Sequence, residues 1–494
     1  MSTLGDLLAR GTPVGAHAPF PCAVVDASVW QDAVAALEAG SLTLLSVWGE
    51  IGRVHMALLG EDDPPVVVLS LDCPDETYPA IGARHAPAIR LERAIRDLFG
   101  LEPMGLPDTR PWLDHGRWDG EAPPAASYPF LPVEGGPLHQ IPVGPVHAGI
   151  IEPGHFRFTA DGETVVRLEQ RLGYVHKGID ALLAGTPIPR AQRIAARISG
   201  DSTVAYGWAF ARAVESALGV TAPRRAAWLR AVMAEMERIA NHLGDFGAIC
   251  NDASFSVMLA HCAVLRETVL RCAAACFGHR LMMDRIVPGG VVADLDSAGA
   301  AMIRDLITEI GARFPPLVDL YDKMASLQDR TVTTGILHPE LARRFGAGGY
   351  VGRASGRDFD CRRRPGYAPY DALSFTVPVR RDGDVNARVW IRIEEITQSL
   401  SLLRQLLDTL PDGPVMAPAG AEIVDGEGMA LVEAFRGDVL VWLRIADGVV
   451  ARCHARDASW FQWPLLEAVI EGNIVADFPL CNKSFNCSYA GHDL

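Results

Sequence analysis

Helical periodicity dominates the middle of the chain. Apolar residues recur every three or four positions over residues 202–218, 224–246 and 256–283, with few helix breakers inside these segments. One face of the second segment carries a broad apolar stripe made of Ala226, Leu229, Val232, Met233, Met236, Ile239 and Ala240. Such a stripe is typical of the core of a helical bundle. Two further helices, predicted over residues 297–314 and 389–410, extend this bundle.

The N-terminal part of the chain has a different pattern. Residues 28–100 alternate short apolar runs with helical stretches, which indicates a small α/β domain. Between Leu113 and Pro145, prolines and glycines accumulate, and such a composition cannot continue a helix or a central strand. We therefore predict an N-terminal domain over residues 1–113, a Pro/Gly-rich linker over 114–142 and a main domain over 143–494.

The main domain also contains strand-like segments. Two of them, Phe156–Thr159 and Thr164–Leu168, are joined by Asp161-Gly162 and predict a β hairpin. Residues 424–445 have the pattern of strands again, and the chain closes on residues 464–471 and a tail expected to be extended. The predicted fold class is α+β, with a small α/β domain followed by a mainly α-helical bundle with β hairpins.

Composition excludes several partners. Among 494 residues, 45 Lys and Arg face 60 Asp and Glu, and the net charge of −15 argues against a nucleic-acid or anionic-lipid surface. No apolar stretch approaches the roughly 18 residues of a membrane-spanning helix, and the first residues lack a basic segment followed by a long apolar one. We expect a cytoplasmic chain whose membrane attachment comes through partners.

Familiar cofactor motifs are missing. The ten cysteines include no C-x-x-C pair, so no zinc ribbon or iron–sulfur ligand run is visible, and a reducing compartment fits them. Cys272 and Cys276 would share a helix face, where core thiols are a simpler interpretation than half of a metal site. No G-x-G-x-x-G, P-loop, H-E-x-x-H or G-x-S-x-G motif of the required context occurs.

Two polar clusters are candidates for proton chemistry. Glu152, His155 and Arg157 enter a predicted strand and can converge on one proton path or one anion, unless they form a solvated turn. The segment after it carries Tyr174, His176, Lys177 and Asp180. If this segment is helical, its tyrosine, lysine and aspartate share a face, although a solvated amphipathic helix has the same pattern.

Three further polar features have ordinary structural explanations. Arg197 precedes Asp201 and Ser202, either of which could cap the following helix. His242 lies on a helix with an apolar face and is expected to be a core histidine. The run Arg362–Arg364 is most simply a solvated loop, or alternatively a clamp for an acidic face of a neighbouring subunit.

Many ordered motifs of the main domain resemble one known family. These are G-P-V-H at 144–147, E-P-G-H-F-R at 152–157, R-L-G-Y-V-H-K-G at 171–178, E-R-I-A-N-H-L-G-D-F-G-A at 237–248, R-A-S-G-R-D at 353–358 and the closing segment from Asn473. They are similar to the large subunit of membrane-bound nickel-iron hydrogenases of the formate-hydrogenlyase type, and to the related quinone-site subunit of respiratory complex I. The earlier E-R-A-I-R-D-L-F-G at 92–100 resembles the smaller complex I subunit fused in front in the hydrogenlyase proteins.

The resemblance implies a hydrogenase-large-subunit-like fold docked on an iron–sulfur subunit, but the chemistry differs. In these hydrogenases four cysteine thiolates hold nickel and iron. The matching positions here are Ser199, Ser202, Ser488 and Gly491. A serine hydroxyl is a hard, unionised ligand at neutral pH and glycine offers no ligand, so we expect no nickel-iron centre.

The quinone-site equipment of complex I is also incomplete. His147 matches the first histidine of that site, Ile151 falls near the second, and Gly200 stands at the tyrosine. Two residues match hydrogenase groups beside the metal. Glu152 matches a proton-carrying glutamate, and Arg436 matches the arginine near the diatomic ligands of the iron.

The leading hypothesis is a peripheral-arm subunit of a complex-I-like, hydrogenase-related membrane redox complex. The chain itself is expected to bind no cofactor, while iron–sulfur clusters lie in a partner subunit and NAD or quinone acts at the level of the complex. Expected partners are an iron–sulfur small subunit of the complex I type and membrane-arm subunits. The chain would lie on the inner face of the cell membrane and couple electron transfer to proton translocation.

Two alternatives remain open at this point. In one, the pocket stays redox-active and reduces quinone or another acceptor held by Tyr206, Arg197, Asp201 and His492, as in an NADH-quinone oxidoreductase. Tyr206 lies about one helical turn after Ser202 and could therefore face the same cavity. In the other, the chain is a structural docking module between an electron-input subunit and the membrane arm.

Overall fold

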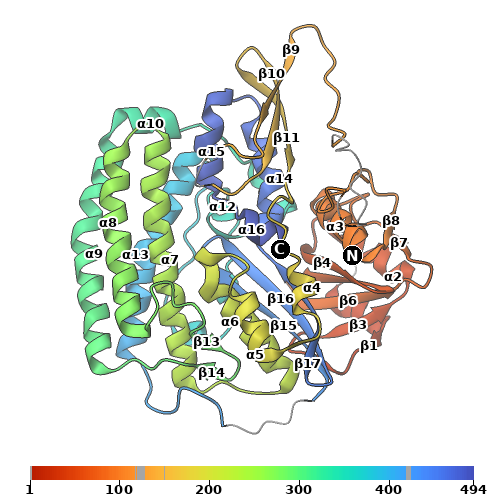
Figure 1. The fold of residues 1–494 in the computed structure, drawn as a ribbon, viewed down its shortest axis with the longest axis horizontal. Coiled ribbons are helices and arrows are strands. Elements are labelled where there is room, and N and C mark those ends of the chain that lie inside the picture. Colours follow the sequence, from red (N-terminus) through yellow and green to blue (C-terminus); the bar gives the residue numbers. More distant parts are fainter. Residues whose placement is uncertain (1–2, 117, 119–127, 149–150, 419–423) are drawn as a thin grey trace.

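The N-terminal part of the molecule is built around a five-stranded sheet (Figure 1). The computed structural model describes residues 3–116, 118, 128–148, 151–418 and 424–494. The sheet order is β1 (Thr12–Pro13), β3 (Cys22–Val25), β6 (Val66–Asp72), β5 (Arg53–Leu59) and β4 (Thr43–Glu50), with α1 (Leu4–Ala9), α2 (Ala27–Glu38), α3 (Ile89–Phe99) and the strand pair β7 (Thr77–Pro79) and β8 (Glu102–Met104) around it. The α/β pattern predicted from the sequence is confirmed.

A second sheet joins the two parts of the chain. Its order is β12 (Thr186–Pro187), β17 (Val449–Arg456), β16 (Gly437–Ala446), β15 (Gly426–Ala434) and β2 (His17–Ala18). Strand β2 comes from the N-terminal region and pairs in parallel with β15. Between the two sheets, the buried Trp48 ring stacks on His55 and on His454, with ring centroids 5.2 Å apart in both cases. The N-terminal domain is thus packed tightly on the main domain.

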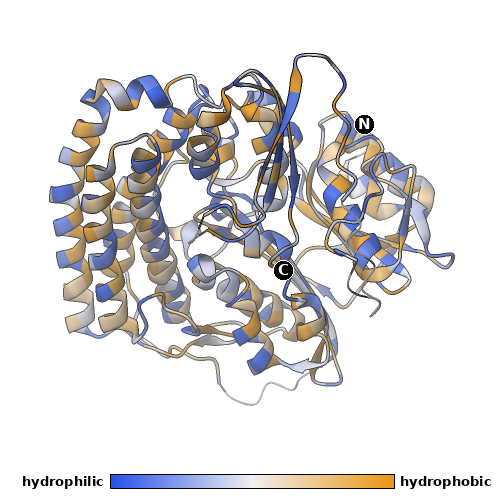
Figure 2. Ribbon diagram, turned by 45° about the horizontal axis from the view of Figure 1, so that its top comes forward, coloured by the Kyte–Doolittle hydropathy of each residue, from blue (hydrophilic) through white to orange (hydrophobic). Residues whose placement is uncertain are grey.

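The helical bundle forms the other half of the molecule (Figure 1). Its long members are α7 (Arg224–Asp252), α8 (Ser256–Phe277), α9 (Ser297–Lys323) and α13 (Val385–Asp408), whereas α6 (Thr203–Leu218), predicted to belong to it, packs mainly on β15 and β16. The short helices α4 (Ile179–Leu183) and α5 (Ile188–Ala195) precede α6. The connections between the bundle helices contain β13 (Ile286–Val287), β14 (Gly290–Val291), α10 (Ala325–Thr331), α11 (Pro339–Arg344) and α12 (Gly349–Arg353). Figure 2 shows hydrophobic and hydrophilic residues alternating along the bundle helices, as amphipathic packing requires.

Several helix boundaries differ from the predicted ones: α7 runs six residues further, to Asp252, and α13 begins at Val385 and ends at Asp408. Helix α9 does not stop at Phe314 but continues through Pro315 and Pro316. Both prolines are exposed, so the backbone acceptors that lose their N–H partners can bond to water. Helix α8 ends earlier than predicted, because Gly278 adopts a left-handed conformation with φ 74°.

The predicted β hairpin is confirmed as β10 (His155–Asp161) and β11 (Thr164–Arg171). Strand β9 (Leu138–Val143) pairs with β10 and forms one edge of this three-stranded sheet. It contains Pro142, which an edge strand tolerates because one side of the backbone needs no partner. Part of the segment predicted to be a linker therefore belongs to a sheet, while residues 119–127 lie outside the described part of the chain.

The C-terminal tail is helical, and the prediction of an extended tail was wrong. After α14 (Ser459–Ile470), the chain forms α15 (Phe478–Phe485) and α16 (Tyr489–Asp493). Ser488 begins α16 as its N-cap, because its hydroxyl accepts a hydrogen bond from the Gly491 amide. Among the helices described, none combines the length and the hydrophobicity needed to cross a membrane.

Candidate functional site

The loop of residues 199–202 meets the start of α16 in the interior of the main domain. The Ser199 and Ser488 hydroxyl oxygens are 2.9 Å apart, and both residues are buried. An ideal Cβ placed on Gly491 would lie 3.0 Å from the Ser488 hydroxyl oxygen. Ser202 is also buried, and its hydroxyl lies 3.4 Å from the same Asp201 oxygen, Oδ1, that accepts from Ser199. The structure therefore brings together the four positions that the sequence singled out as former metal ligands.

Hydrogen bonds among these groups run in one direction. The Ser199 hydroxyl donates to the Asp201 carboxylate at 2.8 Å, so its single hydrogen is committed and the Ser488 hydroxyl must donate to Ser199. Ser488 in turn accepts from the Gly491 amide at 2.9 Å. The result is a relay from the backbone of α16 through two hydroxyls to a carboxylate. Thiolates, which only accept hydrogen bonds, could not form it.

Arg436, in the turn between β15 and β16, fixes the carboxylate end of the relay. Its guanidinium makes a bidentate contact with Asp201, at 2.9 and 2.6 Å, and also donates to the Asn486 carbonyl before α16. Burial of the Asp201 carboxyl raises its pKa, but the Arg436 charge and the serine hydroxyls outweigh this and lower the pKa to about 2. Asp201 is therefore ionised at neutral pH, and a guanidinium supplies the positive charge at this place.

Tyr206 faces the same cluster, as the sequence predicted, but through another residue. Its buried hydroxyl donates to Asp457 Oδ2 at 2.7 Å, and the other carboxylate oxygen accepts from the Ser459 amide at 2.8 Å. An ideal Cβ on Gly491 would lie only 2.6 Å from Asp457 Oδ2. The sequence did not single out Asp457, because nothing in the segment around it signals contact with residue 491.

The first predicted proton cluster does not converge. Glu152 is exposed and accepts a hydrogen bond from the Ala490 amide of α16 at 3.2 Å. His155 is buried and bonds to the Gly144 carbonyl, while Arg157 bonds to Gln140 on β9. Alternation along β10 places both of these side chains on the face opposite to Phe156, away from Glu152. The three side chains therefore do not share one proton path, and the prediction that they converge was wrong.

The second predicted cluster is not helical, because residues 172–178 form a loop that precedes α4. His176 donates to the Asp493 carbonyl at 2.7 Å, and Lys177 Nζ donates to the Ile198 carbonyl at 3.0 Å. Both residues thus tie this loop to α16 or to the 199–202 loop. Tyr174 is 38% exposed, and Asp180 instead pairs with Arg452 of β17, so the proposed common face does not exist.

The four residues expected to hold a redox acceptor do not surround one space. Arg197 is 46% exposed and makes a bidentate ion pair with Asp284, away from the cluster. His492 is buried, stacked on Trp460 with ring centroids 4.1 Å apart, and bonded to Asp493. Tyr206 and Asp201 are already engaged with protein groups. The geometry therefore does not support an acceptor held by this set.

Comparisons with known proteins agree with this architecture. The family described as "Respiratory-chain NADH dehydrogenase, 49 Kd subunit" matches residues 252–424. Formate hydrogenlyase subunit 5 of Escherichia coli (strain K12) is 31% identical over 448 residues, which cover 86% of this chain and 79% of the relative.

The chain belongs to the family of complex I 49 kDa subunits and their hydrogenase relatives.

Other relatives span both branches of this family. An NADH-quinone oxidoreductase subunit of Syntrophobacter fumaroxidans is 31% identical over 345 residues, covering 69% of this chain and 92% of the relative. Among solved structures, a chain of the membrane-bound sulfane sulfur reductase, an archaeal respiratory membrane complex, matches with a TM-score of 0.68 and 25% identity. That match covers 72% of this chain and 98% of the other.

The residues at the four positions that the sequence resemblance assigns to metal ligands do not fit a nickel-iron centre. Soft metal centres need deprotonated, polarisable sulfur, and the cluster offers three hydroxyls, bonded within the cluster, and a glycine. Cys487, which directly precedes Ser488, is buried, and burial raises the pKa of its thiol, so the thiol stays protonated. Across the described residues, no group of three or more His, Cys, Asp or Glu side chains has an arrangement suited to a metal ion.

The N-terminus of α6 is capped from another helix, contrary to the predicted cap by Asp201 or Ser202. The Glu237 carboxylate, on α7, accepts hydrogen bonds from the Val204 and Ala205 amides at 2.8 and 3.2 Å. Burial raises the pKa of Glu237 to about 8. Because this cap comes from a different helix, the sequence next to α6 carries no signal for it, and the sequence did not predict it.

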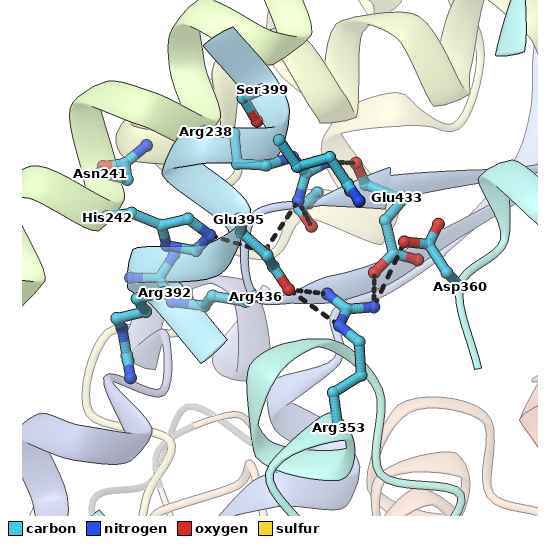
Figure 3. Close-up of polar contacts among 12 residues, drawn as sticks. Arg238, Asn241, His242, Arg353, Asp360, Arg392, Glu395, Ser399, Glu433 and Arg436 are labelled. Carbon is cyan, nitrogen blue, oxygen red and sulfur yellow. Dashed lines mark hydrogen bonds and ion pairs between the residues drawn. The ribbon is translucent and has the colours of Figure 1, made fainter. Parts of the chain in front are cut away.

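Behind the cluster lies a buried network of ion pairs (Figure 3). Arg353 of α12 contacts Glu395 of α13 at 2.8 Å and Glu433 of β15 at 2.9 Å. His242 of α7 bonds to the other oxygen of Glu395 at 2.7 Å, which confirms it as a core histidine. Asp360 joins the network beside Arg353 at 3.5 Å. The network connects three helices and a sheet without access to water.

The arginine run has three separate environments and is not a uniform solvated loop. Arg362 is buried and pairs with Asp360 at 2.7 Å and with Glu235 at 2.9 Å. Arg364 reaches Glu61 of the N-terminal domain. Arg363 is exposed and the Arg364 side chain is 37% exposed, but Arg362 is buried, so the run cannot clamp an acidic partner with all three guanidinium groups.

Proposed function

We propose that the chain is a peripheral-arm subunit of a complex-I-like membrane redox complex that works without a nickel-iron centre. Membership of such a complex is supported by the relatives of the chain, which include subunits of formate hydrogenlyase and of NADH-quinone oxidoreductase. We propose further that it docks on an iron–sulfur small subunit on the cytoplasmic side and touches membrane-arm subunits. The chain would transmit conformational or proton coupling rather than carry out redox chemistry itself.

One observation carries this proposal. The four former ligand positions still meet, but their hydroxyls form a relay that ends on the Asp201–Arg436 ion pair. A site that had merely decayed would leave buried polar groups unpaired, and each would cost about 1–3 kcal/mol. Here the serine hydroxyls all have partners, which supports a retained role for this part of the fold.

The coupling route that we propose runs through α16. On one side, Ser488 at its start bonds to Ser199. On the other side, the α16 backbone at Ala490 holds Glu152, and Asp493 holds His176. The segments that carry these residues also expose apolar side chains, namely Val146, Ile151, Tyr174 and Leu182, which would suit contact with a membrane-arm subunit.

The experiment is a pair of matched substitutions in the intact membrane complex. Glu152→Gln changes the carboxylate that meets α16, and Glu163→Gln changes an exposed glutamate in the turn of the β10–β11 hairpin that follows Glu152. We expect Glu152→Gln to keep electron transfer but lower proton translocation at least severalfold, with Glu163→Gln unchanged. If Glu152→Gln leaves both activities intact, coupling through this residue is wrong and the chain is a docking module.

A further inference from the structure

Asp457 stands where the side chain of the fourth ligand position would have to lie. This rests on the proposed function in one respect, namely that position 491 holds no metal ligand. We propose that Asp457 is a positioning residue, whose carboxylate fills this volume and thereby seats α16 against the 199–202 loop. Glycine at 491 is then required by Asp457 and is not simply a ligand that was lost.

The space around Gly491 supports the proposal. An ideal Cβ at this position would lie 2.6 Å from Asp457 Oδ2 and 2.9 Å from its Cγ, and 3.0 Å from the Ser488 hydroxyl oxygen. The first two distances are shorter than real Cβ contacts, so any side chain at 491 must displace the carboxylate. Gly491 has an ordinary helical place in α16, so its backbone conformation does not demand glycine.

Asp457 cannot move aside freely, because both of its oxygens are held. Oδ2 accepts from the Tyr206 hydroxyl at 2.7 Å, and Oδ1 accepts from the Ser459 amide at 2.8 Å. Asp457 and Tyr206 are both at most 2% exposed, so a broken bond would leave a polar group without water. The carboxylate therefore acts as a fixed spacer between α6, α14 and α16.

The close approach of α16 is what allows its other contacts. Ser488 reaches Ser199, and Trp463 of α14 donates to the Ser488 carbonyl at 3.3 Å. Asp493, at the far end of α16, accepts from the Val175 amide at 3.1 Å. Displacement of Asp457 should consequently loosen the relay and the 174–177 loop together.

Hydrogen–deuterium exchange of the purified complex tests this directly. Gly491→Ala should raise the exchange rates of the Val175, Ala490 and residue 491 amides by about tenfold or more. The matched control is Gly200→Ala in the adjoining loop, since an ideal Cβ there meets no atom within 4 Å. Unchanged protection of the α16 amides in Gly491→Ala would overturn the proposal.

A second set of variants distinguishes this steric role of Asp457 from a general destabilisation of the fold by Gly491→Ala. In Asp457→Ala/Tyr206→Phe, the carboxylate and the hydroxyl that depends on it are both absent, so Gly491→Ala should add little to the exchange rates. An equal effect of Gly491→Ala in both backgrounds would contradict the assignment to Asp457. Nickel content is not a readout here, so the outcome can fail or succeed independently of whether the complex lacks a nickel-iron centre.

Discussion

At the scale of single residues, exchanging sulfur for oxygen changes what the cluster can do. Ser199 and Ser488 both donate and accept hydrogen bonds, which lets the chain satisfy its own interior. The sequence was sufficient to identify these positions, because they lie in recognisable motifs. It could not identify Asp457 or Glu237, because each acts on a segment far away along the chain.

The relay predicts the effect of removing one hydroxyl. Ser199→Ala leaves the Ser488 hydroxyl without its acceptor and removes one donor to Asp201. We expect the free energy of unfolding to fall by about 1–3 kcal/mol, measured by urea denaturation. The exposed Ser256→Ala is the control and should change it by less than about 0.5 kcal/mol. Equal stabilities of the two variants would contradict the relay.

Glu237 predicts an unusual pH dependence. Its pKa of about 8 in the folded protein lies above that of an unfolded glutamate, so the folded state binds more protons between these values. Stability should therefore fall as pH rises from about 5 to 8, by up to about 1.4 kcal/mol per pH unit from this group. Glu237→Gln should flatten this slope in urea denaturation, whereas exposed Glu340→Gln should not. A wild-type slope in Glu237→Gln would show the assignment to be wrong.

For the helices and strands, the apolar periodicity of the sequence predicted the structure correctly wherever the buried face of an element follows that periodicity. The helices around residues 203–218 and 224–252, and the hairpin of β10 and β11, follow their apolar patterns. The sequence left open whether residues 172–178 are helical, and it wrongly predicted an extended tail, because tertiary contacts decide both segments. His176 and Lys177 are fixed by α16 and by Ile198, and neither partner is local in sequence.

The contact between the two sheets should weaken in acid. Burial, together with the nearby Arg452 and Arg456, lowers the pKa of His454 well below its ordinary value, so the folded protein keeps it neutral beside Trp48. The unfolded chain binds this proton below about pH 6.5, and stability should fall as the pH drops from there. His454→Gln should reduce this acid sensitivity in urea denaturation followed by tryptophan fluorescence, and exposed His261→Gln should not. If the free energy of unfolding of His454→Gln falls in acid as steeply as that of the wild type, the prediction is wrong.

At the scale of the whole molecule, the parts are joined by buried polar contacts that no single segment encodes. Strand β2 of the N-terminal region completes the second sheet, and Arg364 ties the bundle side to Glu61. Arg353, Glu395 and the residues around them link helices and sheet behind the cluster (Figure 3). The sequence supplied the fold class and family, but these cross-links depend on the assembled chain.

The ion-pair network predicts a large effect of breaking it in the middle. Arg353→Met removes the cation between Glu395, Glu433 and Asp360, all without water, and should lower the free energy of unfolding by about 3–5 kcal/mol. The partly exposed pair of Arg380 and Glu394 provides the control, and Arg380→Met should cost at most about 1 kcal/mol. Similar urea midpoints for the two variants would contradict a structural role for the network.

We infer that oxygen side chains and a carboxylate stand in place of a nickel-iron centre at the junction of the 199–202 loop and α16. Elemental analysis of the intact complex, purified from its own membrane after growth with nickel, tests it most directly. We expect iron from the clusters of partner subunits and nickel far below one atom per chain. Nickel near one atom per chain that disappears when Ser199, Ser202 and Ser488 are all replaced by alanine would contradict it.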